Sequence, residues 1–224
     1  MPTVVLFDID GTLVTTAGAG RAALDAAVAQ VTGVSGSLAG VAIAGRTDRA
    51  ILGDALANAR VAVPGHEEAF ERVIEAYLQL LPGHVAAVKG NVLPGVEALL
   101  TALDAESAVS TLATGNLRVG AEIKLRHFNL WRPEFELGGF GDVSPVRADV
   151  VRAAMVPHSN GAIGQFVVVG DTPHDVTAAH EAGARAIAVA TGAFSSAALM
   201  DAGADAVFED LAETAAVLRT LLNL

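Results

Sequence analysis

The chain has 224 residues, no cysteine, and 14 basic against 25 acidic side chains, which gives a formal net charge of −11. The absence of cysteine excludes a disulfide scaffold, thiolate-bound zinc, an iron–sulfur cluster and thiol catalysis, and it fits the reducing cytoplasm that we expect as the location. The acidic balance excludes general binding to nucleic acid or to an anionic membrane surface, because few cations are present to neutralise their phosphates.

Short apolar runs that end in aspartate or glycine are typical of central parallel strands that lead into a loop. Such runs occur at residues 4–7, 108–113, 166–169 and 186–189. Helical patterns lie between and after them, at residues 95–103, 117–128, 174–182 and 211–221. Strands that alternate with helices are typical of βαβ units. The pattern therefore predicts the α/β class, with a doubly wound parallel sheet between two layers of helices.

Residues 15–90 break this alternation, because they contain helical patterns and no convincing strand. The patterns cover residues 21–31, 48–59 and 67–81, and residues 33–40 and 61–65 connect them. We interpret residues 15–90 as a small helical cap domain, inserted after the first strand of an α/β core. The core would consist of residues 1–14 and 91–224, with hinges near residues 13–17 and 85–93.

Polar side chains gather where the predicted strands end. Asp8 and Asp10 follow the first strand, Thr114 the second, and Asp171 a later one. Ligands of open α/β sheets bind outside the carboxyl ends of the strands, so we expect these residues at one edge. Side-chain alternation places Asp8 and Asp10 on the same side, where two carboxylates repel each other unless they share a cation or a proton. With Asp171 they form a cluster of hard oxygens that suits Mg²⁺.

A phosphate site is expected beside these carboxylates. Thr114 and Asn116 lie at the N-terminus of the helix predicted from residue 117. The free backbone N–H groups at a helix N-terminus favour a bound phosphate. Mg²⁺ takes few protein carboxylates and keeps ligand positions for such a group.

This constellation resembles the haloacid dehalogenase superfamily of phosphotransferases. Residues 8–12 (Asp-Ile-Asp-Gly-Thr) are similar to its first motif, residues 112–116 (Leu-Ala-Thr-Gly-Asn) to its second, and residues 169–175 (Val-Gly-Asp-Thr-Pro-His-Asp) to its fourth. The third motif requires a lysine or arginine between the second and fourth, and Arg147 is the candidate. The resemblance covers essentially the whole chain. The position of the insert matches the helical-cap subclass, of a phosphoglycolate phosphatase-like type.

The resemblance implies a Mg²⁺-dependent phosphatase that acts on a small phosphorylated metabolite through an aspartyl-phosphate. Asp8 would be the nucleophile, and Asp10 the general acid and then the general base. Mg²⁺ would be held by Asp8, the backbone carbonyl of Asp10, and Asp171. Asp175 would not bind the ion directly but would lie next to the residues that do. The groups that hold the phosphoryl oxygens would be Thr114, Gly115, Asn116 and Arg147.

Motif order alone does not choose between two cations for the third motif, Lys124 and Arg147. Lys124 is ten residues beyond Thr114, about 10 Å along the predicted helix, which we expect to be too far from the phosphate. Arg147 follows a possible short strand at residues 135–140 and precedes a helix predicted at residues 148–155. A guanidinium also binds two phosphate oxygens at once, so we favour Arg147. The family more often has a lysine next to a proline here, from which Arg147 departs.

A second candidate substrate contact lies in the insert. Residues 45–49 (Gly-Arg-Thr-Asp-Arg) precede a predicted helix, for which Thr47 or Asp48 can serve as the N-cap. Arg46 is our candidate for reaching the substrate or the loop that bears Asp8. We expect His174 to be an exposed residue in the first turn of its helix.

Three other functions stay open as alternatives. A phosphomutase would keep the same core and transfer the phosphoryl group to a sugar hydroxyl. A binding or regulatory protein on this fold usually lacks the nucleophile or a metal ligand, whereas the motif positions are intact here. A dehalogenase would use Asp8 alone, so the presence of Asp10 and Asp171 disfavours it.

Overall fold

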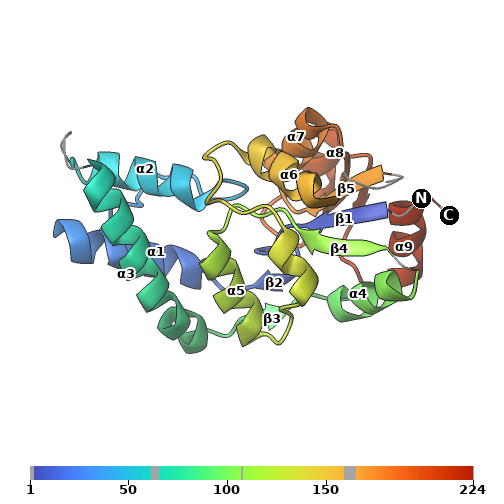
Figure 1. Ribbon diagram of the computed structural model, residues 1–224, viewed down its shortest axis with the longest axis horizontal. Helices are drawn as coiled ribbons and strands as arrows, with labels where there is room; N and C mark the ends of the chain where they lie inside the picture. The colour runs from blue at the N-terminus through green and yellow to red at the C-terminus, as the bar shows by residue number, and fades with distance from the viewer. Residues whose placement is uncertain (1–2, 62–65, 107, 159–164, 224) are drawn as a thin grey trace.

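The computed structural model describes residues 3–61, 66–106, 108–158 and 165–223. Its main sheet has five strands, all parallel to their neighbours, in the order β4-β1-β5-β6-β7. The strands are β1 (Thr3–Phe7), β4 (Val109–Leu112), β5 (Gln165–Gly170), β6 (Arg185–Val189) and β7 (Ala206–Phe208). Figure 1 shows helices on both sides of this sheet, so the predicted α/β class is confirmed.

Alternate side chains of the strands enter two different cores. Val5 and Phe7 of β1 pack with α4 (Val96–Ala105), α5 (Arg118–His127) and α9 (Thr214–Leu222). On the opposite face of the sheet, Val4 and Leu6 pack with α6 (Arg147–Met155), α7 (Pro173–Ala182) and α8 (Ser196–Asp201). A strand that is buried on both faces reads as a continuous apolar run, which is why β1 was recognisable in the sequence.

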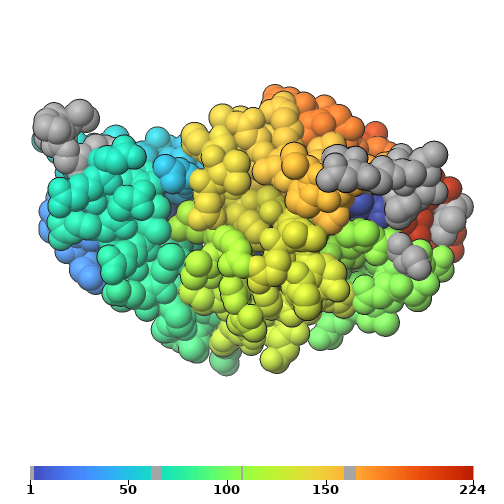
Figure 2. Space-filling view, viewed as in Figure 1, coloured from blue at the N-terminus to red at the C-terminus, as the bar shows by residue number. Residues whose placement is uncertain are grey.

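The insert has an apolar core of its own. Its helices are α1 (Ala19–Thr32), α2 (Asp48–Asn58) and α3 (His66–Ala87), and their buried side chains form a third cluster, to which the α/β part contributes Leu117. Figure 1 shows these helices to one side of the sheet, and Figure 2 shows α2 and α3, in cyan, packed against the green and yellow surface around α5 and α6. The division into a core and a cap domain stays a prediction.

The chain passes between the insert and the sheet at two neighbouring places. There β2 (Val14–Thr15) and β3 (Asn91–Val92) form a short antiparallel pair. Neither strand was expected, because two residues carry no periodicity. Across the described residues, no helix combines the length and the apolar character needed to cross a bilayer.

Apart from a possible strand at residues 135–140, the predicted helices and strands are present, with ends shifted by at most six residues. The connector predicted at residues 61–65 lies outside the described residues except for position 61. The possible strand at residues 135–140 is wrong. Residues 133–137 instead form a 3-10 helix, η1 (Pro133–Leu137), and Gly139 alone makes a bridge, to Ala113. Pro133 favours the first position of a helical turn, because its φ is fixed and it has no N–H to donate.

Candidate active site

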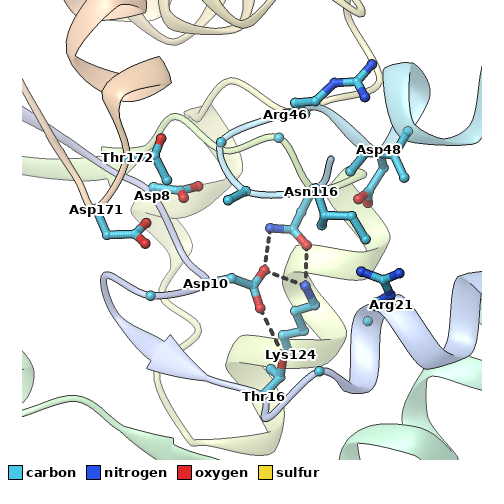
Figure 3. A pocket seen from close by; sticks show the side chains of 18 of the residues that line it. Asp8, Asp10, Thr16, Arg21, Arg46, Asp48, Asn116, Lys124, Asp171 and Thr172 are labelled. Atoms are coloured by element: carbon cyan, nitrogen blue, oxygen red, sulfur yellow. Dashed lines mark hydrogen bonds and ion pairs between the residues drawn. The ribbon is translucent and has the colours of Figure 1, made fainter. Parts of the chain in front are cut away.

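The motif residues surround one cavity of about 460 Å³, between the carboxyl ends of the strands and the insert. Asp8 and Asp10 follow β1, Asn116 lies between β4 and α5, Arg147 begins α6, and Asp171 follows β5. Figure 3 shows several of these side chains directed toward a common space. The order of strands reverses beside β1, the place where open α/β sheets bind their ligands.

Asp8 lies against the first of two buried cations. Its Oδ1 is 2.9 Å from Nη2 of Arg147, which is also 2.7 Å from Oδ1 of Asp175. Burial raises the pKa of Asp8, and the charge of Arg147 offsets part of that effect. Burial alone would lower the pKa of Arg147, but Asp8 and Asp175 raise it above its ordinary value. The guanidinium is therefore held in its charged form next to Asp8.

Asp171 is a buried carboxylate without a counter-charge. It is 5% exposed, and its Oδ1 accepts no hydrogen bond from any described residue. Burial raises its pKa to about 8, and the carboxylates of Asp175 and Asp8 add to this increase. Asp8, Asp171 and Asp175 present oxygens within 4.8 Å of one another. An unpaired buried oxygen in such a cluster fits a hard divalent cation, which would neutralise the repulsion.

Asp175 has two partners besides this cluster. Its Oδ2 accepts hydrogen bonds from the backbone N–H and the hydroxyl of Thr172, in a capping box at the start of α7. Its Oδ1 accepts from Arg147 at 2.7 Å. Asp175 therefore both caps the helix and orients the guanidinium beside Asp8. His174, its neighbour, is exposed as expected.

The carboxylate of Asp10 contacts a different cation from that of Asp8. Its Oδ2 accepts from Nζ of Lys124 at 2.5 Å and from Nδ2 of Asn116 at 3.0 Å, and its Oδ1 accepts from the hydroxyl of Thr16 at 3.0 Å. Burial alone would raise the pKa of Asp10, but these three partners lower it. Since β1 ends at Phe7, strand alternation does not govern the two aspartates. The two aspartates line the same cavity, but Asp8 pairs with Arg147 and Asp10 pairs with Lys124.

The prediction that Lys124 lies too far away is wrong, although the helix itself was placed within one residue of its observed ends. The Cα–Cβ bonds of a helix tilt toward its N-terminus, so a long side chain reaches back over the preceding turn. Lys124 does this and ends at Asp10, as Figure 3 shows. A signal was available, because Lys124 falls three residues after Ala121 and next to Leu125, on the buried face of α5.

The second motif is packed tightly under the insert. Thr114 is fully buried, and its hydroxyl accepts a hydrogen bond from Nδ2 of Asn116 at 2.8 Å. A Cβ on Gly115 would lie 2.8 Å from Nη1 of Arg147 and would collide with the backbone carbonyl of Arg46. Only glycine lets the backbone of the insert approach the motif this closely. Gly115 and Asn116 line the cavity with Arg147.

The insert contacts the motif loops through residues 45–48, which we call the docking loop. The N–H of Asp48 donates to the carbonyl of Gly115 at 2.7 Å, and Oδ2 of Asp48 accepts from the N–H of Leu117 at 2.9 Å. The hydroxyl of Thr47 donates to the carbonyl of Pro145 at 3.1 Å and accepts from Ala50, as the N-cap of α2. Burial raises the pKa of Asp48 to about 6.

The guanidinium of Arg46 does not contact the loop that bears Asp8 in this structure, and its contact with a substrate stays a prediction. Arg46 instead forms an ion pair with Asp54 of α2 at 2.7 Å and donates to the carbonyl of Ala42. Figure 3 shows its side chain directed away from Asp8 and Asp10. Asp54 offers a nearby counter-charge on the exposed side of its helix, so the guanidinium turns outward.

Sequence reasoning also missed residues that the insert contributes to the cavity. Thr16 contacts Asp10, while Arg21 and Tyr77 line the space opposite the motifs. Tyr77 is 2% exposed and lies on the buried face of α3. Such residues follow no short motif, because the loop after β2 and two separate helices, α1 and α3, bring them to the cavity.

A family model described as haloacid dehalogenase-like hydrolase matches residues 5–180. A search of curated proteins found no match. Among solved structures, a protein named a predicted phosphatase from Clostridium acetobutylicum has a TM-score of 0.72 at 23% identity, with 100% of each chain covered. A hydrolase from Pseudomonas syringae also has a TM-score of 0.72 at 23% identity, covering 98% of this chain and 99% of its own.

A further similar structure is a Bacteroides vulgatus protein provisionally named as a beta-phosphoglucomutase. Its TM-score is 0.69 at 19% identity, with 100% of this chain and 91% of that chain covered. Identities this low show a common fold. The match to the family model shows membership of the family as well as the fold, because residues 5–180 include β1, β4, β5, the insert and the motif residues around the cavity. On that match, the chain belongs to the family of haloacid dehalogenase-like hydrolases.

Proposed function

We propose that this hydrolase is a Mg²⁺-dependent phosphatase, which hydrolyses a small-molecule phosphate monoester through an aspartyl-phosphate on Asp8. The observation that carries the proposal is the pairing of Asp8 with Arg147 beside an uncompensated Asp171. A carboxylate nucleophile and a phosphate ester are both anions, so their reaction requires positive charge at the site. The buried guanidinium supplies one such charge, and the carboxylate cluster is suited to hold another.

In the first half-reaction, an oxygen of Asp8 attacks phosphorus, and the bond from phosphorus to the ester oxygen breaks. Asp10 acts in its protonated form and gives this proton to the departing oxygen, so that the product leaves as an alcohol. Arg147 and the loop formed by Thr114, Gly115 and Asn116 bind the phosphoryl oxygens during transfer. In the second half-reaction, Asp10 takes a proton from a water molecule, which attacks phosphorus and releases inorganic phosphate and free Asp8.

The residues that would hold Mg²⁺ are Asp8, Asp10 through its backbone carbonyl, and Asp171. Asp175 would lie next to these ligands without binding the ion directly. When bound, the ion supplies positive charge that offsets the repulsion between nucleophile and ester. The unpaired Oδ1 of Asp171 supports this assignment, because a buried carboxylate oxygen is normally hydrogen-bonded or bound to a metal.

We further propose that residues 15–90 act as a cap, which excludes bulk water and supplies the contacts beyond the phosphate. The hydrogen bonds of the docking loop with Gly115, Leu117 and Pro145 support a closed arrangement. A phosphomutase would use the same core and differ only in the acceptor of the phosphoryl group. This alternative stays open because one similar structure, from Bacteroides vulgatus, is provisionally named as a beta-phosphoglucomutase.

The test is hydrolysis of p-nitrophenyl phosphate with Mg²⁺, with EDTA, and with EDTA followed by excess Mg²⁺. We expect activity that EDTA removes and Mg²⁺ restores, and no activity in an Asp8→Asn variant that keeps the wild-type melting curve. Full activity in EDTA would refute the metal assignment. A panel of phosphorylated metabolites, analysed for free phosphate and for isomers, then separates a phosphatase from a mutase.

A further inference from the structure

Lys124 is an unusual residue in its position. It is one of two lysines in the chain, it lies in the last turn of α5, and its side chain is 5% exposed. Lysine is seldom buried, because the transfer of an ammonium group from water is costly unless the charge is paired and hydrogen-bonded. A lysine buried at the cavity wall therefore calls for a role that an apolar residue would not fill.

The partners of Lys124 are two groups of the motif loops. Its Nζ is 2.5 Å from Oδ2 of Asp10 and 2.5 Å from Oδ1 of Asn116. Neither partner is near in sequence, so α5 brings the ammonium to the junction of the first and second motifs. There is room for it because residue 20 of α1 is a glycine, whose Cβ would lie 3.2 Å from Nζ.

The contact with Asn116 fixes which way its amide faces. An amide has one acceptor and one donor end, and an ammonium can only donate. With Oδ1 facing Lys124, Nδ2 faces Asp10 at 3.0 Å and the hydroxyl of Thr114 at 2.8 Å. Lys124 thus orients Asp10 twice, by its own contact and through Asn116. The hydroxyl of Thr16 donates a hydrogen bond to the other carboxylate oxygen of Asp10, Oδ1.

We propose that Lys124 is a positioning residue that holds the carboxyl group of Asp10 in place for proton transfer to the leaving group. The proposal rests on the proposed function, in which Asp10 is the general acid. Arg147 lies beside Asp8 instead, so the two cations have separate tasks. Loss of Lys124 would leave the attack by Asp8 intact and would misplace the proton donor.

This division predicts a dependence on the leaving group. p-Nitrophenol leaves readily as an anion and needs little help from an acid, whereas an alkyl alcohol needs a proton. For Lys124→Met we expect kcat to fall about 10²-fold or more with an alkyl phosphate such as glycerol 2-phosphate, and less than about tenfold with p-nitrophenyl phosphate. KM should stay nearly constant for both. Lys124→Arg, which keeps the charge, should recover part of the loss.

The matched control is Lys89→Met, the same substitution at the other lysine. Lys89 is exposed and has no hydrogen bond or ion pair with any described residue. A double-mutant cycle adds a second control, because Lys124→Met should cost nothing further in an Asp10→Asn background if Lys124 acts through Asp10. Lys124→Gln, which keeps a neutral donor, replaces Lys124→Met in all assays if the latter does not fold.

A crystal structure of the Lys124→Met enzyme supplies a readout that does not depend on activity. We expect the Asp10 carboxylate to turn from its present position and the amide of Asn116 to lose its orientation, with neither change in Lys89→Met. The proposal is overturned if Asp10 and Asn116 stay in place, if both esters lose the same factor, or if only KM rises. An inactive wild type would instead refute the proposed function, and the crystal structures would still decide the role of Lys124.

Discussion

Gly45 offers a direct test of whether the docking loop closes the active site. Its φ is +70°, a conformation that side chains of L residues rarely adopt, and an added Cβ would collide with the hydroxyl of Thr172 and lie 2.7 Å from Cβ of His174. Gly40 has a φ of +74° and nothing within 4 Å of an added Cβ. Gly45→Ala and Gly40→Ala therefore impose similar backbone strain, and Gly45→Ala alone adds a collision with the α/β part.

The size of the effect follows from the contacts that a displaced docking loop would break. These are the hydrogen bonds from Asp48 to Gly115, from Leu117 to Asp48, and from Thr47 to Pro145. At about 0.5–1.5 kcal/mol for each bond, the closed arrangement would lose about 1.5–4.5 kcal/mol. Since about 1.4 kcal/mol corresponds to a factor of ten, its population would fall about 10-fold to 10³-fold.

The assay compares kcat/KM and the melting temperature of both variants with those of the wild type. Both should melt earlier, because a side chain in the left-handed region costs about 1–2 kcal/mol. Only Gly45→Ala should lose kcat/KM, by the factor above. Equal kcat/KM values for Gly45→Ala and Gly40→Ala, with both variants folded, would show that contact between the docking loop and the motif loops is not needed for turnover.

Three further variants test the charges of the site. Arg147→Ala should lower kcat/KM about 10²-fold or more for alkyl and aryl phosphates alike, because it removes a donor to the phosphoryl group; a loss confined to poor leaving groups would contradict this. Asp171→Ala should weaken Mg²⁺ binding in calorimetry without changing the fold, and unchanged affinity would remove Asp171 from the metal site. The pKa of Asp48 is raised from 3.8 to about 6, so the folded state binds the proton more tightly and loses stability as pH rises between these values. Asp48→Asn should therefore raise the melting temperature relative to the wild type more at pH 8 than at pH 4. The corresponding gain in the free energy of unfolding is at most about 3 kcal/mol.

The sequence predicted the sheet and the motif loops because their signals are local. β1 is apolar on both faces and is followed by aspartates, so the four consecutive apolar residues 4–7 identify it. β7 was missed, since its three residues are half-buried and form no apolar run that stands out from an alanine-rich chain. The six-residue helix α8 was missed for a similar reason, because it is too short for a helical period to repeat.

The two errors at the site have one physical origin. For Lys124, distance was measured along the helix axis, although side chains reach back toward the helix N-terminus. For Arg46, its position just before a predicted helix of the insert was taken to indicate a reach toward the loop with Asp8, whereas the charge of Asp54 directs the guanidinium elsewhere. A sequence pattern places a backbone position well, whereas the direction of a long charged side chain depends on partners that only the tertiary structure brings near.

The contacts around the two motif aspartates also bear on the proposed divalent ion. The group contains two cations, Arg147 and Lys124, and four carboxylates, Asp8, Asp10, Asp171 and Asp175. With all six residues ionised, its formal charge is −2, and the carboxylate left without a partner for Oδ1 is Asp171. A phosphate ester is itself an anion, so it would enter against this charge. One divalent cation at Asp171 would offset this negative charge, so we expect removal of such an ion to abolish turnover.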